Sequence, residues 1–193
     1  MFGFGRLLRS HSYCSLRPAL ALALYQSKRL GKNSLHFYHA DMDELVSQRR
    51  ALAADLRNAL AHEEFSLVFQ PQVNAATHAV QGFEALLRWN HKTRGQVSPV
   101  EFIPLAEETG AIIPIGEWAL REACRTAAQW PRGIKIAVNV SPIQFRFSEL
   151  PKMVEKALAD SGLEAHRLEL ELTESALLEN SQQTQSTLHA LRA

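Results

Sequence analysis

The sequence predicts an α/β fold in which a mostly parallel sheet is covered by helices. Strand patterns and helix patterns alternate from residue 134 onward, and this repetition is typical of parallel strands joined by right-handed crossovers. The strand segments at residues 134–140 and 168–172 are largely apolar, which suits a sheet that is covered on both faces. Two earlier strand segments are separated by a loop too short for a crossover helix, so we expect that pair to be antiparallel.

The predicted antiparallel pair consists of residues 65–73 and 79–89, joined by a short polar loop. In the second segment, the period of two residues places Glu84, Leu86 and Arg88 on one face of the strand. The bulky apolar side chains of the same segment fall on the other face. The strand therefore separates a face with charged residues from an apolar face.

Helix signals mark the segment after this pair. Ser98 and Glu101 have the spacing of a capping box, with Pro99 at the first helical position, and they predict a helix that Gly110 ends. The remaining predicted elements are helices at residues 115–130, 150–161 and 175–193 and strands at residues 134–140 and 167–172.

The N-terminal part of the chain has a different pattern. Residues 1–19 show no periodicity, remain unassigned and are expected to be disordered. Residues 20–40 contain a helical pattern that ends at Gly31, followed by a short strand pattern. Residues 41–61 are amphipathic and predict a helix that connects into the main domain, which we place at residues 62–193.

Charge is distributed unevenly along the 193 residues, whose formal net charge is +1. The first 40 residues contain six Lys or Arg and no Asp or Glu, so the remaining 15 basic and 20 acidic residues carry a net charge of −5. The balanced total argues against a surface that follows a nucleic acid backbone, because such a surface needs concentrated Lys and Arg. No apolar run reaches the roughly 18–20 residues of a membrane-spanning helix. The acid-free start leaves a short targeting peptide as an open alternative.

The cysteines and glycines restrict the chemistry further. Cys14 and Cys124 have no metal-ligand spacing, and we expect both to be free thiols in a reducing compartment. No dinucleotide-binding glycine fingerprint or P-loop follows a predicted strand, which argues against a nucleotide-cofactor site. A Rossmann-like open sheet and a TIM-type barrel both fit the strand order, and the missing fingerprint favours the barrel.

Three polar side chains lie near the C-terminal ends of different predicted strands, namely Glu84, Asn139 and Glu171. In a barrel these ends converge on one mouth, where catalytic residues lie. Two carboxylates and an amide oxygen are hard ligands, which suit Mg²⁺ or Mn²⁺ better than zinc. Each residue also has a simpler interpretation: Glu84 as a solvent-facing residue of an edge strand, Asn139 as a turn former, and Glu171 as a partner of a helix dipole. Arg88 could likewise be an ion-pair partner of Glu84.

Five motifs in a fixed order make the combination specific. They are F-Q-P-Q at residues 69–72, E-A-L-L-R-W at 84–89, F-I-P-L-A-E-E-T-G at 102–110, N-V-S-P at 139–142 and E-L-T-E-S at 171–175. In this order they resemble the EAL phosphodiesterase family, which takes its name from the tripeptide found here at residues 84–86. The resemblance extends over about residues 55–193.

The resemblance implies a TIM-like (βα) barrel whose first strand is antiparallel, of which we expect about four strands here. The implied ligands of a divalent metal, Mg²⁺ or Mn²⁺, are Glu84, Asn139 and Glu171. The implied substrate-binding residues are Gln70, Leu86 and Arg88. Among these, Arg88 is implied to hold a substrate phosphate. The implied reaction is two-metal hydrolysis of cyclic di-GMP to linear pGpG.

The resemblance also implies residues that this sequence lacks. The family continues with a strand that ends in paired aspartates, then with a lysine and a further glutamate on later strands, whereas the sequence ends at Ala193. We therefore expect the N-terminal half of an EAL domain, which binds metal poorly and hydrolyses cyclic di-GMP at no useful rate. An unpaired strand edge and an open inner face carrying Leu86 and Val138 predict self-association.

A weaker resemblance lies upstream, where residues 21–33 are similar to the last helix and turn of a GGDEF diguanylate cyclase domain. Residues 1–18 do not match what precedes that helix in the family, which suggests a truncated or frame-shifted gene or a misplaced start codon. Two other interpretations stay open: a non-catalytic module that binds cyclic di-GMP or a protein, and a pseudogene product without a stable fold. The resemblance implies a signal-transduction protein of the bacterial cytoplasm.

Overall fold

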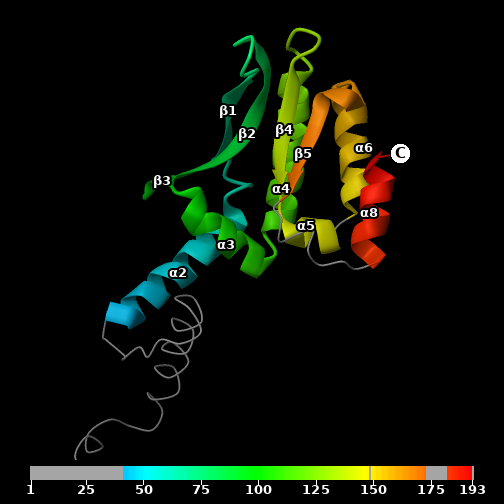
Figure 1. Cartoon of the computed structure of the whole chain (residues 1–193). Coiled ribbons are helices and arrows are strands. Elements are labelled where there is room, and N and C mark those ends of the chain that lie inside the picture. Colours follow the sequence, from blue (N-terminus) through cyan, green and yellow to red (C-terminus); the bar gives the residue numbers. More distant parts are fainter. Residues whose placement is uncertain (1–40, 148, 173–181, 193) are drawn as a thin grey trace, which may run out of the picture. The chain divides into compact units, whose positions relative to one another are not determined.

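The computed structural model describes residues 41–147, 149–172 and 182–192, and Figure 1 shows the whole chain. The chain divides into two compact units, Met1–Leu52 and Ala53–Ala193. The described part of the first unit belongs to helix α2 (Asp41–Asn58), which covers most of the range predicted to be a connecting helix. The elements predicted before residue 41, and the first residues of the helix predicted at the C-terminus, lie outside the described residues.

A five-stranded sheet organises the second unit, within the residues that the structure describes. Its strands are β1 (Phe65–Val73), β2 (Val80–His91), β3 (Gly95–Val97), β4 (Lys135–Val140) and β5 (Leu168–Leu172). The strand order is β1-β2-β4-β5, and β3 pairs with β2. Strands β1 and β2 are antiparallel, whereas β2 with β4 and β4 with β5 are parallel. The predicted combination of a hairpin with a parallel sheet is therefore confirmed.

Asn74 closes the loop between β1 and β2. Its Oδ1 accepts the backbone N–H groups of Ala76 (2.9 Å) and Thr77 (3.0 Å), and its own N–H donates to the Ala79 carbonyl (2.9 Å). Asn favours turns because its short side chain can bond the backbone two residues further along. The resulting hairpin has a register in which Gln70 lies opposite Glu84.

Strand β3 is absent from the sequence prediction, and β2 runs two residues beyond its predicted end. The two strands are joined by a turn in which His91 Nδ1 accepts the N–H groups of Thr93 and Arg94, both at 3.2 Å. Gly95 begins β3 with a φ of 72°, a conformation that glycine adopts without steric cost. A strand of three residues is too short to show an alternating pattern, so no sequence signal marks it.

Helices connect the strands after β3, and a further helix follows β5. They are α3 (Pro99–Thr109), α4 (Ile112–Ala127), α5 (Pro142–Phe147), α6 (Leu150–Ser161) and α8 (Gln182–Arg192), with a 3₁₀ turn η1 (Ala165–Arg167). Helix α6 has the predicted bounds, α4 begins and ends three residues before its predicted bounds, and α5 and η1 are too short to have been predicted from periodicity. Among the described residues, no helix combines the length and apolar character that crossing a membrane requires.

The helix ends agree with the sequence prediction in part. Gly110 and Gly162 end α3 and α6 in the left-handed conformation, with φ of 75° and 69°. Ser98 occupies the N-cap position of α3, but its side chain makes no capping hydrogen bond. Instead, the Ser98 carbonyl accepts the N–H groups of Glu101 (2.9 Å) and Phe102 (3.1 Å). The predicted capping box at Ser98 is therefore wrong, although the helix begins where it was predicted.

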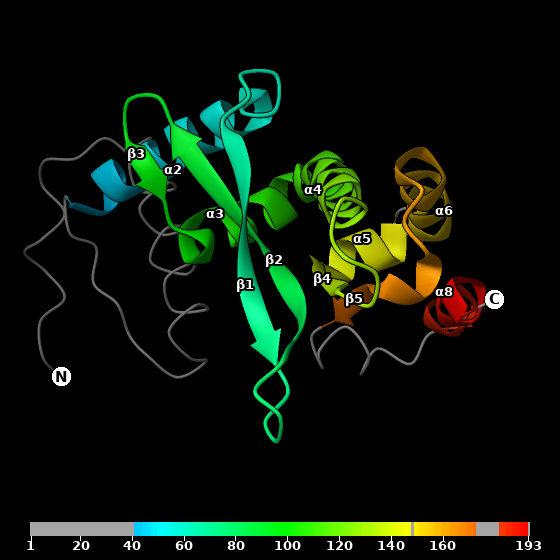
Figure 2. The same cartoon turned by 90° about the horizontal axis from the view of Figure 1, so that it is seen from above.

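One face of the sheet packs against α4 and α6, which lie side by side on the same side of β4 and β5 (Figure 2). Ile136 and Val138 of β4 are buried in a core with Ala123 of α4 and Ala157 of α6. Val138 is 4% exposed and lies opposite Ala85 in the parallel ladder, so these two side chains share the helix-covered face. The expectation that Leu86 and Val138 share one face of the sheet is therefore wrong. Leu86 follows Ala85 directly, and neighbouring residues of a strand point to opposite faces.

Cys124 lies in the same core as a free thiol, as the sequence predicts, whereas Cys14 lies outside the described residues. Burial raises the pKa of the Cys124 thiol to about 11. The thiol therefore stays protonated at neutral pH, and the thiolate is the form that acts as nucleophile or metal ligand. Its role is packing.

Candidate functional site

The three predicted metal ligands lie on neighbouring strands. In the ladders, Glu84 of β2 lies opposite Ala137 of β4, and Asn139 of β4 lies opposite Glu171 of β5. Residues that are paired in a ladder, or two apart in a strand, project to the same face, so Glu84, Asn139 and Glu171 all share the face opposite α4 and α6. Asn139 Nδ2 donates a hydrogen bond of 2.7 Å to Glu84 Oε1.

The three predicted ligands do not all lie at the C-terminal ends of their strands, although the sequence predicts this arrangement. Asn139 and Glu171 are each the next-to-last residue of their strand, whereas Glu84 lies inside β2. However, the parallel ladder between β2 and β4 ends at Ala85, one residue after Glu84. Glu84 therefore lies at the end of the pairing, and this brings it within hydrogen-bonding distance of Asn139.

The donor set fits a hard divalent cation. Glu84 and Glu171 supply carboxylate oxygens, and Asn139 supplies an amide whose Oδ1 and Nδ2 exchange places when χ2 turns by a half-rotation. In the orientation of this structure, the Asn139 Nδ2 group donates a hydrogen bond to the Glu84 carboxylate. In the turned orientation, Asn139 Oδ1 and a Glu84 carboxylate oxygen would both face a cation. Among the described residues, no three His, Cys, Asp or Glu side chains come together as a metal site, so a site that uses Glu84 and Glu171 takes its third protein donor from the Asn139 amide.

Glu169, the other carboxylate that β5 places on this face, already has a cationic partner. Its Oε1 accepts a hydrogen bond from Lys135 Nζ of β4. Both residues are near the N-terminal ends of their strands, away from Asn139. Glu171 is thus the β5 carboxylate that is available beside Asn139.

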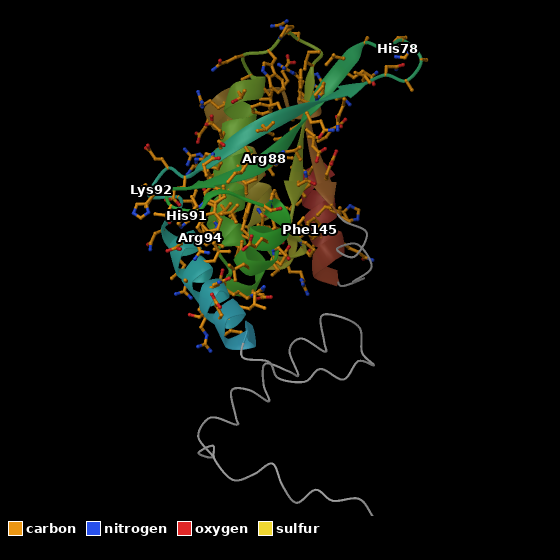
Figure 3. The ribbon with its side chains drawn as sticks, turned by 90° about the vertical axis from the view of Figure 1, so that its left-hand side faces the viewer. His78, Arg88, His91, Lys92, Arg94 and Phe145 are labelled. Atoms are coloured by element: carbon orange, nitrogen blue, oxygen red, sulfur yellow. The ribbon has the colours of Figure 1, made fainter. Side chains whose placement is uncertain are left out.

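The three predicted substrate-binding residues lie on β1 and β2. Gln70 is exposed and lies opposite Glu84, and Leu86 and Arg88 follow Glu84 at intervals of two on the same face. Figure 3 shows Arg88 part-way along β2, between His78 at the tip of the hairpin and His91 at the other end. The Arg88 Nη1 donates to the Leu87 carbonyl at 3.0 Å. No ion pair joins Arg88 to Glu84 in the part of the chain that the structure describes, so the simpler interpretation of Arg88 as an ion-pair partner is not supported.

A comparison with protein families assigns this arrangement to a known domain. The family model described as "EAL domain" matches residues 53–193. The chain belongs to the EAL domain family. Solved EAL proteins are TIM-like barrels, and the five-stranded sheet is a part of such a barrel, which confirms the predicted fold class. EAL phosphodiesterases are in general metal-dependent enzymes.

Two bacterial relatives illustrate the sequence similarity of this EAL domain. An uncharacterized signaling protein of Caulobacter vibrioides is 46% identical over 172 residues, which are 89% of this chain and 21% of that protein. The bifunctional diguanylate cyclase/cyclic di-GMP phosphodiesterase MucR of Pseudomonas aeruginosa is 39% identical over 175 residues, which are 89% of this chain and 26% of that protein. The chain thus spans between a fifth and about a quarter of the length of these curated relatives.

A solved structure shows the same fold with a ligand. The structure described as the PaMucR phosphodiesterase in a c-di-GMP complex aligns with a TM-score of 0.70 and 41% sequence identity. The alignment covers 74% of this chain and 59% of the solved chain.

A hydrogen-bond network that the sequence analysis missed anchors the end of β4 in this EAL domain. Ser141 Oγ donates to Glu107 Oε1 of α3 (2.7 Å) and accepts the N–H of Ile143 (3.2 Å). Gln144 Oε1 accepts the Ser141 N–H (3.0 Å), which completes a capping box at the start of α5. The spacing Ser-x-x-Gln directly after β4 was the available signal. The network fixes the backbone two residues after Asn139.

Two pockets in the described part of the chain lie away from the predicted site. A pocket of about 460 Å³ lies between α4 and α6 and is lined in part by Trp118, Arg121 and Asp160. Another, of about 280 Å³, is lined in part by Asp55 and His91, whose side chains meet at 3.2 Å between Oδ2 and Nε2. Neither contains a predicted metal or substrate residue. Those predicted residues share the face of the sheet opposite α4 and α6.

Proposed function

We propose that residues 53–193 form part of a phosphodiesterase domain that hydrolyses cyclic di-GMP to linear pGpG. The observation that carries this proposal is the contact of Asn139 with Glu84 on the same face as Glu171, which gathers three oxygen-bearing side chains from three strands. Membership of the EAL family and similarity to a phosphodiesterase structure with bound c-di-GMP support it.

We propose that Glu84, Asn139 and Glu171 hold one divalent cation, Mg²⁺ or Mn²⁺. Such an ion supplies positive charge that neutralises the phosphodiester and makes water a better nucleophile. The protein's own contribution is to place the two carboxylates and the amide on one face of neighbouring strands. The capping box after β4 supports this arrangement, because it holds the backbone that carries Asn139.

Arg88 is proposed to bind a phosphate of the dinucleotide. A guanidinium group presents paired N–H donors that match two phosphate oxygens, and it stays charged at all physiological pH values. Only Nη1 of Arg88 is recorded in a hydrogen bond within the described residues, to the Leu87 carbonyl, so the Nη2 group remains for a ligand. Leu86 offers an apolar surface between Glu84 and Arg88, and Gln70 offers an amide across the ladder from Glu84.

Metal binding tests the proposed ligands directly. We expect the 193-residue chain to bind Mn²⁺ weakly, and Glu84→Gln to weaken binding by at least about tenfold, because removal of even an outer-shell partner costs 10–100-fold. Electron paramagnetic resonance of free Mn²⁺ measures the affinity. Glu169→Gln is the matched control, since it makes the same charge change on the same face at a carboxylate that is paired with Lys135. Equal losses in the two variants would contradict the assignment.

Hydrolysis by this chain alone is expected to be absent. The family resemblance implies paired aspartates, a lysine and a further glutamate, which these 193 residues do not supply, so a second metal has too few ligands. Chromatography of cyclic di-GMP incubated with the chain and Mn²⁺ should show no pGpG above background. Turnover that Glu84→Ala abolishes would show that the retained residues suffice. Binding of cyclic di-GMP without turnover, lost in Arg88→Ala, would favour the non-catalytic binding module.

The open sheet is proposed to drive self-association. Val68 is 46% exposed on the same face as Leu86, and β1 and β5 are the outer strands of the described sheet order. Exposed apolar side chains and strand edges favour pairing with another chain. Sedimentation velocity at micromolar concentration should therefore give a dimer or larger species, and Val68→Lys should shift the distribution toward the monomer. A monomer for the unmodified chain would overturn the proposal.

For the upstream residues we propose a remnant of a GGDEF domain at residues 20–40 and a connecting helix at residues 41–61. The name of MucR, a bifunctional diguanylate cyclase/cyclic di-GMP phosphodiesterase, supports this proposal, because a relative of this chain combines the two activities. Residues 1–19 remain without an assigned role. We propose that the protein is a signalling component of the bacterial cytoplasm. Its signalling role is supported by relatives that are bacterial proteins, one of which is described as a signaling protein.

A further inference from the structure

A hydrogen bond joins the two outer strands of the sheet order on the face that carries the proposed site. Gln72 Nε2 of β1 donates to Glu171 Oε1 of β5 at 3.3 Å. In the order β1-β2-β4-β5 these strands are separated by three strand spacings, or about 14 Å in a flat sheet. The side chains of Gln72 and Glu171 can meet only because the sheet curves toward this face. The first strand of the domain therefore reaches the last described strand across the interior of the partial barrel.

We infer that Gln72 is a positioning residue that holds the Glu171 carboxylate in place beside Asn139. This inference rests on the proposed function of Glu171 as a metal ligand. Glu171 Oε2 makes no recorded hydrogen bond in the described part of the chain, so Gln72 engages one carboxylate oxygen and leaves the other. Ligating carboxylates are commonly oriented in this way by an outer hydrogen-bond donor, and loss of such a donor lowers metal affinity.

The neighbouring glutamine on the same face does not share this role. Gln70 is exposed, lies opposite Glu84 and makes no recorded hydrogen bond within the described residues, whereas Gln72 is half-buried. The two glutamine side chains thus have different surroundings on the same face. Gln70 is near the surface expected for substrate, and Gln72 contacts the carboxylate.

The chemistry of the amide matters for this role. A neutral amide donates an N–H to a carboxylate oxygen without adding a positive charge that would compete with a cation for the same carboxylate. An isosteric glutamate at position 72 would place a second carboxylate at hydrogen-bonding distance from Glu171, where like charges repel. A lysine would restore a donor that is long enough to reach Oε1. Gln72→Glu therefore removes the donor at an almost unchanged side-chain volume, and Gln72→Lys restores a donor at the same position.

The test uses the full 193-residue chain with specific isotope labelling of glutamate. We expect side-chain scalar couplings of Glu171 to report one dominant rotamer in the unmodified chain and rotamer averaging in Gln72→Glu, with recovery in Gln72→Lys. In parallel, Gln72→Ala, which removes the donor without adding a carboxylate that would itself attract Mn²⁺, should lower Mn²⁺ affinity by about tenfold or more. Gln81→Glu and Gln81→Ala are the matched controls, because Gln81 is exposed in the adjacent strand, and they should leave the corresponding measurements unchanged.

The outcomes separate this inference from the proposed function. A single Glu171 rotamer that persists in Gln72→Glu, or averaging that is already present in the unmodified chain, overturns the positioning role. An Mn²⁺ affinity that Glu84→Gln leaves unchanged overturns the proposed metal site, and the rotamer measurement still decides whether Gln72 orients Glu171. If Gln72→Glu does not fold, as judged by circular dichroism, Gln72→Ala removes the donor without adding charge and must give the same averaging.

Discussion

Arg167→Leu is expected to lower the free energy of unfolding by about 3 kcal/mol, since hydrogen bonds to charged groups contribute about 1.5–3 kcal/mol each. Arg167 is 4% exposed, and its guanidinium joins two elements. Nε donates to the Ile134 carbonyl just before β4 (2.9 Å), and Nη2 donates to the Ala127 carbonyl at the end of α4 (2.7 Å). The negative end of the α4 dipole adds to the stabilisation of the cation. Leucine fills part of the volume but leaves these carbonyl contacts unmade.

Urea denaturation followed by circular dichroism measures this loss. Arg121→Leu is a suitable control, because Arg121 is exposed on α4, and surface substitutions of this kind change stability by within about 0.5 kcal/mol. Arg167→Lys retains the charge but not the forked geometry, so its stability should fall between those of the unmodified chain and Arg167→Leu. An unchanged urea midpoint for Arg167→Leu would show that the two carbonyl contacts contribute nothing.

Gly116→Ala is expected to destabilise the fold by about 2 kcal/mol, within the 1–3 kcal/mol range typical of overpacked cores. Gly116 lies inside α4. At an exposed position inside a helix, replacing glycine with alanine ordinarily stabilises the fold by about 1 kcal/mol. Here a Cβ atom would lie 2.6 Å from Cδ of Gln144, below the 3.0 Å that real Cβ contacts respect. Gln144 is buried and accepts the Ser141 N–H, so it cannot move aside without breaking the capping box of α5. The clash therefore outweighs the helix propensity.

A double-mutant cycle tests the cause of this effect. Gln144→Ala removes the clashing atoms, so Gly116→Ala should become neutral or stabilising in that background. The interaction free energy of the cycle should be on the order of 2 kcal/mol, measured by urea denaturation. An equal cost of Gly116→Ala in both backgrounds would place the strain elsewhere than at Gln144.

Much of the fold could be predicted because the decisive patterns are local. The alternation in β2 correctly separated the face of Glu84, Leu86 and Arg88 from the apolar face, since strand geometry makes this a property of spacing alone. Gly110 and Gly162 correctly marked helix ends, because glycine adopts the left-handed conformation that a helix end needs.

The errors concern contacts between segments that are distant in sequence. The motif F-Q-P-Q identified the strand that carries Gln70 and Gln72, but no local pattern indicates that Gln72 meets Glu171, which is 99 residues away and three strands distant. The same limit applies to Ser141, whose partner Glu107 comes from a different helix. Ser98 shows the converse problem: its motif fits a capping box, yet the side chain makes no capping hydrogen bond.

The shortness of the ladder between β2 and β4 has a mechanical consequence. It runs only from Gly82 to Ala85, whereas β1 and β2 pair along the whole of β1. Four residue pairs are thus the whole ladder between the hairpin and the helix-covered strands. The hydrogen bonds from Asn139 to Glu84 and from Gln72 to Glu171 both join the hairpin to those strands. The angle between the hairpin and the helix-covered strands therefore sets the spacing of the proposed ligands, because a change in that angle would alter both distances together.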